Sequence, residues 1–93
     1  MATPASAPTG KLTMYTTSWC GFCKRLKSQL ARDGIYLHEV DIERDPEAAE
    51  FVMSVNGGNQ TVPTVVFPDG TVMTNPPAKK VKQHLESLQT AAE

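Results

Sequence analysis

The first stretch of regular pattern lies at residues 11–16, where polar and apolar residues alternate and include β-branched and aromatic side chains. This alternation predicts a β-strand. From residue 21 to about residue 32 the pattern changes to a helical one, with apolar residues every three to four positions. These residues are Phe22, Cys23, Leu26 and Leu30. Asp33-Gly34 is expected to end the helix, because glycine suits a left-handed cap.

The next two elements are a strand and a helix. Residues 35–42 predict a second strand that places Tyr36, Val40 and Ile42 on one face and acidic residues on the other, which favours an edge position. Asp45-Pro46-Glu47 predicts a helix start, with an Asp cap, a proline in the first turn and an acid near the positive end of the helix dipole. An apolar stripe follows at helical spacing and ends before Asn56. It consists of Ala48, Phe51, Val52 and Val55.

The last third of the chain predicts a hairpin and a helix. Residues 62–67 are nearly all apolar and fit a central strand, while Pro68, Asp69 and Gly70 form a turn after Phe67. Residues 71–73 are then a short antiparallel partner. After Asn75-Pro76-Pro77 a final helix has one apolar face, formed by Ala78, Val81, Leu85 and Leu88.

The element order is therefore β-α-β-α-β-β-α. The first β-α-β unit requires a right-handed crossover and a parallel pair, and the hairpin adds two antiparallel strands. We expect an α/β fold with a four-stranded mixed sheet and helices on both faces.

Length and composition narrow the possible functions. The chain of 93 residues has room for one domain, which we place at residues 11–93 after a disordered extension at residues 1–10. The extension has neither the basic start nor the apolar centre of a secretory signal. A net charge of -1 gives no indication of nucleic-acid binding, and no apolar stretch approaches the roughly 20 residues of a membrane span. We expect a cytoplasmic monomer.

The two cysteines, Cys20 and Cys23, are the strongest chemical signal. A disulfide between cysteines this close in sequence cannot join distant elements and so cannot hold the fold together. The presence of the pair is therefore better explained by its chemical reactivity. Cys20 follows a strand and opens a helix, where free N–H groups and the dipole favour the thiolate that attacks disulfides. Cys23, one turn further, is expected to be more buried and to resolve the mixed disulfide formed on Cys20.

A zinc site and plain core packing are the alternatives to a reactive cysteine pair. A zinc site needs two further ligands, for which only His38 and His84 remain, and their spacing matches no zinc finger. Plain core cysteines are disfavoured because Cys20 falls in a loop. We expect no metal and no chemical role for either histidine.

Aromatic residues and a proline near the thiols are further candidates. Trp19 directly precedes the first cysteine and could form an apolar wall for a substrate. The alternative is that both aromatic residues belong to the core, which is more reasonable for Phe22 than for Trp19. The X-Pro bond of Val62-Pro63 stands where a central strand begins, which a cis-proline at the strand's start would explain. The Val62 backbone would then be free to pair with an extended substrate. From pattern alone, a trans loop proline stays the commoner case.

With these motifs together, the sequence resembles the glutaredoxins. The matching parts are Tyr15-Thr16, Trp19-Cys20-Gly21-Phe22-Cys23, Val40-Asp41-Ile42 and Thr61-Val62-Pro63-Thr64-Val65. The resemblance implies a thioredoxin-like fold with Cys20 as nucleophile, Cys23 as second cysteine and Pro63 as cis-proline. The residues expected to contact the substrate are Trp19, Phe22, Thr61, Val62, Pro63, Thr74 and Asn75.

A further set of residues narrows the resemblance: Tyr15-Thr16-Thr17-Ser18-Trp19-Cys20-Gly21, Phe51-Val52, Ser54-Val55-Asn56-Gly57-Gly58-Asn59, Thr61-Val62-Pro63-Thr64-Val65 and Thr74-Asn75-Pro76. Through these residues the chain looks most like the mycoredoxins, actinobacterial glutaredoxins that work with mycothiol. That group usually has Tyr at the position of Phe22. Glutathione-dependent members often carry a lysine at the position of Thr17, and they have a Gly-Gly-acid stretch where this chain has Met73-Thr74-Asn75-Pro76-Pro77. The resemblance therefore implies reduction of S-mycothiolated proteins, with mycothiol as reducing co-substrate, no bound cofactor, and an NADPH-dependent mycothiol disulfide reductase as indirect partner.

Two alternatives stay open. The chain resembles the glutaredoxin-like hydrogen donors of ribonucleotide reductase, but Thr74-Asn75-Pro76-Pro77 stands where that family has a different segment. An iron–sulfur carrier is a function of another class, and monothiol members of that kind usually have serine at the position of Cys23.

Overall fold

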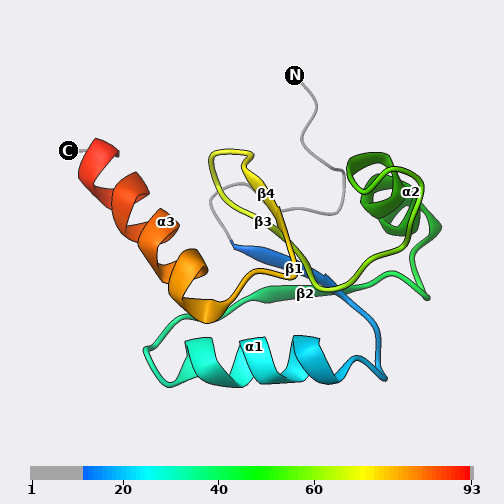
Figure 1. Cartoon of the computed structure of the whole chain (residues 1–93), viewed down its shortest axis with the longest axis horizontal. Coiled ribbons are helices and arrows are strands. Elements are labelled where there is room, and N and C mark those ends of the chain that lie inside the picture. The colour runs from blue at the N-terminus through cyan, green and yellow to red at the C-terminus, as the bar shows by residue number, and fades with distance from the viewer. Residues whose placement is uncertain (1–11, 93) are drawn as a thin grey trace.

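A computed structural model describes residues 12–92, with side chains described through Leu88, and the extension expected at residues 1–10 lies outside this range. The predicted element order is confirmed (Figure 1). The elements are β1 (Thr13–Thr16), α1 (Gly21–Ala31), β2 (His38–Asp41), α2 (Pro46–Val55), β3 (Thr64–Val66), β4 (Val72–Thr74) and α3 (Ala78–Ala92). Among the helices of residues 12–92, none is long and apolar enough to cross a membrane.

The four strands form one mixed sheet in the order β2-β1-β3-β4. β1 pairs in parallel with β2, starting at Thr13 opposite His38, and pairs antiparallel with β3. β3 and β4 form the antiparallel hairpin. The edge position predicted for the second strand and the central position predicted for the third are therefore both confirmed.

Helices cover both faces of the sheet, as expected (Figure 1). On one face α1 and α3 enclose a core that includes Met14, Leu30 and Val81. On the other face α2 packs against β1, where the ring of Phe51 lies 5.1 Å from the ring of Tyr15. Both cysteines belong to the first core, so the α1 face positions the site.

The helix boundaries follow the local signals in the sequence. Gly34 adopts a φ of 76°, and the N–H of Ile35 donates to the carbonyl of Leu30 at 3.0 Å, which closes the left-handed cap predicted for α1. At the start of α2, the Asp45 carboxylate accepts the N–H of Ala48 at 3.2 Å, and Pro46 occupies the first turn.

Three predictions of burial are wrong, and one concerns Val55, the last residue of the apolar stripe of α2, which is 38% exposed. The alternation places Tyr36 on the apolar face of the second strand, but β2 begins only at His38, and Tyr36 is 76% exposed. The chain leaves the α1 cap at residue 35 and reaches register with β1 three residues later. The helical spacing includes Phe22 in the apolar stripe of α1, but its side chain is 66% exposed.

The turn between β3 and β4 is tied to α3 through Asp69. Its carboxylate accepts the N–H of Thr71 at 3.0 Å and the Thr71 hydroxyl at 2.9 Å, and it lies 3.2 Å from Nε2 of His84. The bond from the Thr71 backbone, followed by those from the Thr71 hydroxyl and His84, lowers the pKa of Asp69. His84 also meets the ring of Phe67 edge-on at 4.5 Å.

Asp69→Asn should therefore lower the melting temperature at pH 7 by about a few degrees. Because the folded pKa of Asp69 lies below its ordinary value of 3.8, the stabilisation is present above that pH. It is lost as the pH falls through the lowered pKa. Thermal unfolding from pH 7 to pH 2 tests this, with the exposed Glu50→Gln as control. A difference from the wild type that stays constant down to pH 2 would show that the charge of Asp69 is not its source.

Candidate active site

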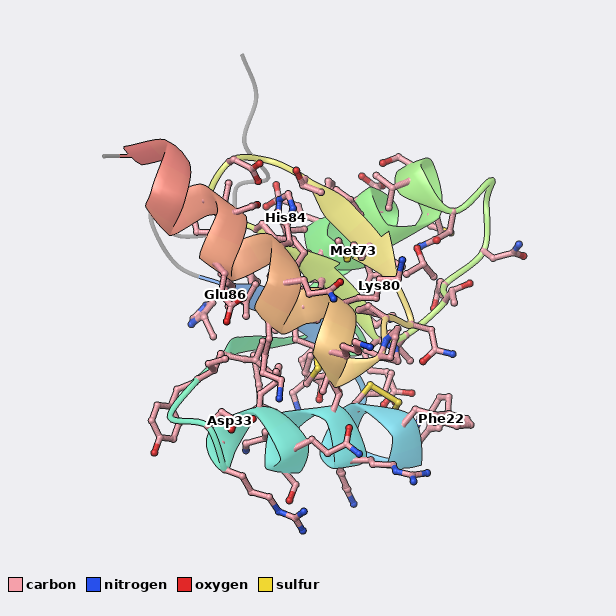
Figure 2. The ribbon with its side chains drawn as sticks, turned by 60° about the vertical axis from the view of Figure 1, so that its left-hand side comes forward. Phe22, Asp33, Met73, Lys80, His84 and Glu86 are labelled. Carbon is pink, nitrogen blue, oxygen red and sulfur yellow. A yellow bond between two sulfur atoms is a disulfide. The ribbon has the colours of Figure 1, made fainter. Side chains whose placement is uncertain are left out.

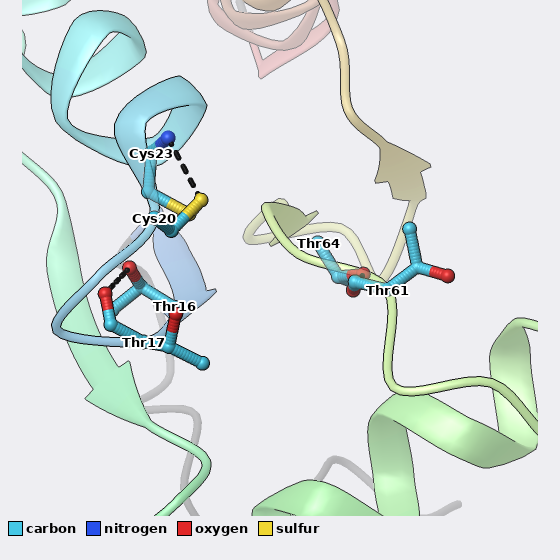
Figure 3. The surroundings of a disulfide bond; sticks show 6 residues. All are labelled: Thr16, Thr17, Cys20, Cys23, Thr61 and Thr64. Carbon is cyan, nitrogen blue, oxygen red and sulfur yellow. Dashed lines mark hydrogen bonds between the residues drawn. A yellow bond between two sulfur atoms is a disulfide. The ribbon is translucent and has the colours of Figure 1, made fainter.

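Cys20 is the N-cap residue of α1, and its backbone is extended rather than helical. Its N–H donates to the carbonyl of Thr17 at 3.3 Å, which closes the turn between β1 and the helix. Its Sγ accepts the backbone N–H of Cys23 at 3.1 Å (Figure 3). A sulfur at this position takes the place of a capping oxygen, so the helix start favours negative charge on it.

Cys23 lies one turn into α1, and its sulfur is bonded to that of Cys20 (Figure 3). The two Cα atoms are 5.3 Å apart, an ordinary separation for a disulfide. Cys20 is 4% exposed and Cys23 is 1% exposed, in the order expected from the sequence. The pair therefore sits where the α1 core reaches the surface.

Two exposed aromatic side chains flank the disulfide. Trp19 is 69% exposed, and its indole N–H donates to the carboxylate of Glu43 at 2.8 Å. Phe22 points outward beside the disulfide in Figure 2. Both side chains are exposed enough to contact a substrate. The hydrogen bond to Glu43 fixes the orientation of the Trp19 indole.

The cis-proline segment lies across from the cysteines. The Val62-Pro63 bond is cis, as predicted. Val62 packs against the core that contains both cysteines, and in Figure 3 the segment carrying Thr61 and Thr64 faces them. The structure therefore brings Thr61, Val62 and Pro63 to the site from a distant part of the sequence.

The segment after β4 completes the site. The N–H of Asn75 donates to the carbonyl of Pro63 at 2.7 Å, so the residues after β4 are held against the cis-proline. Asn75 and Phe22 also line one hollow of about 320 Å³ between α1 and the start of α3. The other residues that line it are Arg25, Leu26, Gln29, Pro76 and Pro77. The site candidates from the sequence thus come from three segments around one disulfide.

The structure adds one residue that the sequence did not single out and gives two others contacts that the sequence did not predict. Glu43, the added residue, holds Trp19, and Asn56 joins the cis-proline segment to β4 through its side-chain amide. Thr17 is 5% exposed and lines a second hollow of about 540 Å³ that Cys23 also borders. Within residues 12–92 no three His, Cys, Asp or Glu side chains are grouped to hold a metal ion.

The sequence model of one protein family, described as Glutaredoxin, matches residues 12–73. The chain belongs to the glutaredoxin family. Glutaredoxins are thiol–disulfide oxidoreductases, and the bonded Cys20–Cys23 pair of this chain supplies sulfurs for such chemistry.

Two relatives match this glutaredoxin over most of its length. A Mycobacterium tuberculosis protein named as a putative glutaredoxin is 61% identical over 80 residues, which are 86% of this chain and 95% of that protein. Mycoredoxin 1 of Corynebacterium glutamicum is 46% identical over 77 residues, 83% of this chain and 95% of its own. The chain therefore spans nearly the full length of both.

Solved structures show the same fold. A thioredoxin-like protein determined by crystallography superposes with a TM-score of 0.68 at 27% identity, covering 81% of this chain and 99% of its own. The solution structure of a glutaredoxin from Brucella melitensis gives a TM-score of 0.66 at 24% identity, over 94% of this chain and 98% of its own. The thioredoxin-like fold expected from the sequence is confirmed.

Proposed function

We propose that this glutaredoxin reduces mixed disulfides between proteins and mycothiol, with Cys20 as nucleophile. The observation that carries the proposal is the Cys20 sulfur at the start of α1, held by the backbone N–H of Cys23 at 3.1 Å. That position stabilises a thiolate, the form of cysteine that attacks a disulfide.

The reaction consists of two thiol–disulfide exchanges. The Cys20 thiolate attacks the mycothiol sulfur of the mixed disulfide, the old S–S bond breaks, and the protein leaves as a thiolate that takes up a proton. A second mycothiol thiolate then attacks the mycothiol sulfur on Cys20 and releases mycothiol disulfide and the Cys20 thiolate. One mixed disulfide and one mycothiol thus give one protein thiol and one mycothiol disulfide. A NADPH-dependent reductase in the cytoplasm would return the disulfide to mycothiol.

The choice of mycothiol is supported by similarity and by charge. The chain is 46% identical to Mycoredoxin 1. Thr17, at 5% exposed, stands where glutathione-type members often carry a lysine for a carboxylate of glutathione, and the neutral Asn75 lies in the stretch where they carry an acid for its other charged end. Mycothiol has a sugar–inositol in place of those carboxylates. The hollow lined by Phe22, Arg25, Gln29 and Asn75 offers an aromatic ring, a guanidinium donor and amide groups, which suit hydroxylated rings.

The substrate contacts follow from the same geometry. The Thr61–Pro63 backbone would pair with the chain that carries the mixed disulfide, while Trp19 and Phe22 form apolar walls on either side of Cys20. Thr74 and Asn75 border the small thiol. Each of these roles is part of the proposal.

Mycothiol, glutathione and thioredoxin reductase should therefore reduce the oxidised protein at different rates. We expect mycothiol to be faster than glutathione by roughly tenfold or more, the effect of one or two hydrogen bonds made to only one of the two thiols. Stopped-flow measurements of Trp19 fluorescence would follow the Cys20–Cys23 bond as it opens. Preference for glutathione, or reduction by thioredoxin reductase alone, would overturn the choice of mycothiol.

A further inference from the structure

Asn56 follows the last residue of α2 and is half-buried. Its side-chain amide makes three hydrogen bonds at once. Nδ2 donates to the carbonyl of Val52 at 2.9 Å and to the hydroxyl of Thr64 at 3.1 Å. Oδ1 accepts the hydroxyl of Thr74 at 2.7 Å. The first bond caps α2, while the other two leave the helix and reach two different strands.

The two strand partners lie beside the proposed substrate-binding segments. Thr64 follows Pro63 directly, and its hydroxyl donates to the carbonyl of Thr61 at 2.8 Å, across the cis-proline turn. Thr74 precedes Asn75, whose N–H holds the carbonyl of Pro63 at 2.7 Å. The Asn56 amide therefore links Thr64, which follows the Thr61–Pro63 segment, to Thr74, the first residue of the Thr74–Asn75 segment.

The donor and acceptor pattern requires an amide. The Thr64 hydroxyl donates its only hydrogen to Thr61, so it can only accept from residue 56. The Thr74 hydroxyl donates, so residue 56 must also accept. A carboxylate would satisfy Thr74 but would place an oxygen against the lone pairs of Thr64. An alanine would satisfy neither threonine.

We infer that Asn56 is a positioning residue for the mixed-disulfide substrate. It holds the Thr61–Pro63 and Thr74–Asn75 segments at a fixed separation without contacting the reacting sulfurs. This inference rests on the proposed function only in assigning those two segments to substrate binding. The C-terminal end of α2 therefore contributes to substrate affinity, although α2 lies on the sheet face opposite α1.

Asn56→Ala and Asn56→Asp should raise KM for a peptide with a mixed disulfide by about tenfold, the effect of losing one or two net hydrogen bonds. The value of kcat and the rate at which iodoacetamide alkylates Cys20 should stay within about twofold, because neither depends on the two segments. Asn59→Ala is the matched control: Asn59 is an exposed asparagine of the same turn, and its side chain donates to the Asn56 carbonyl. It should leave KM unchanged.

Thr74→Val tests the route of the effect, and it carries the test if Asn56→Ala does not fold, since Thr74 is exposed at a strand end. Combining Thr74→Val with an Asn56 variant should raise KM by less than the product of the single effects. Unchanged KM in the single variants, or a loss in kcat and alkylation with constant KM, would overturn the inference.

The KM measurements use two peptides, one with a mixed disulfide to mycothiol and one with a mixed disulfide to glutathione. With both peptides, a wrong choice of thiol can be distinguished from a wrong role for Asn56. A wild type that prefers glutathione contradicts the proposed thiol only, and the rise in KM is then expected on the glutathione peptide.

Discussion

Cys20→Ser is expected to lower the rate of disulfide exchange by a factor on the order of a thousand or more, because a serine hydroxyl cannot replace a thiolate as nucleophile. The fold should remain, since serine is a favourable N-cap residue and its oxygen can accept the Cys23 N–H in place of the sulfur. A coupled assay with a mycothiolated peptide measures the loss.

Circular dichroism and the melting temperature of Cys20→Ser serve as the control for folding. Appreciable turnover in a folded Cys20→Ser variant would show that another group is the nucleophile. Cys23 is the only other cysteine in the sequence, so the double variant Cys20→Ser/Cys23→Ser would identify it.

Cys23→Ser is expected to keep most of the activity toward mycothiol mixed disulfides and to lose activity toward disulfides within one protein by about a hundredfold. The first reaction needs one nucleophile, and the group that stabilises the Cys20 thiolate is the backbone N–H of residue 23, which the substitution retains. The second needs an attacking thiol held close to the mixed disulfide, which only Cys23 provides. The two substrates are assayed side by side.

Cys23 is 1% exposed, so a buried hydroxyl could destabilise the serine variant. Cys23→Ala retains the same backbone donor without that hydroxyl and serves as the second variant. Complete loss of activity on mixed disulfides in a folded Cys23→Ala variant would mean that closure of the Cys20–Cys23 bond is obligatory.

The order and type of every element could be predicted from the sequence, because each carries a local signal. Asp45 caps α2, Gly34 closes α1, and the turn at residues 67–70 joins the hairpin. Strand ends were less predictable. Residues 35–37 continue the apolar pattern of β2, but pairing begins only where β1 offers a partner, and that register depends on how the chain leaves α1.

The site was predictable where a motif is contiguous and unpredictable where it depends on distant partners. Cys20 and Cys23 follow from one contiguous motif, whereas the cis peptide at Pro63 was expected from the strand position of the proline together with the resemblance to glutaredoxins, because pattern alone favours a trans bond. Phe22 lies about 100° around α1 from Cys23, enough to turn it out of the core that the spacing predicts for it. Asn56 gave only a helix-end signal, since its bond to Thr74 spans 18 residues and no local pattern encodes it.

The most direct test asks which sulfur of the mixed disulfide Cys20 attacks, that of mycothiol or that of the protein. Reduced Cys23→Ser is mixed with one equivalent of a mycothiolated protein in the absence of free mycothiol, and the products are identified by intact and peptide mass spectrometry. The account predicts one mycothiol on Cys20 and one free thiol on the protein. A disulfide between Cys20 and the protein, with mycothiol released, would contradict it, because Cys20 would then attack the protein's sulfur instead of mycothiol's.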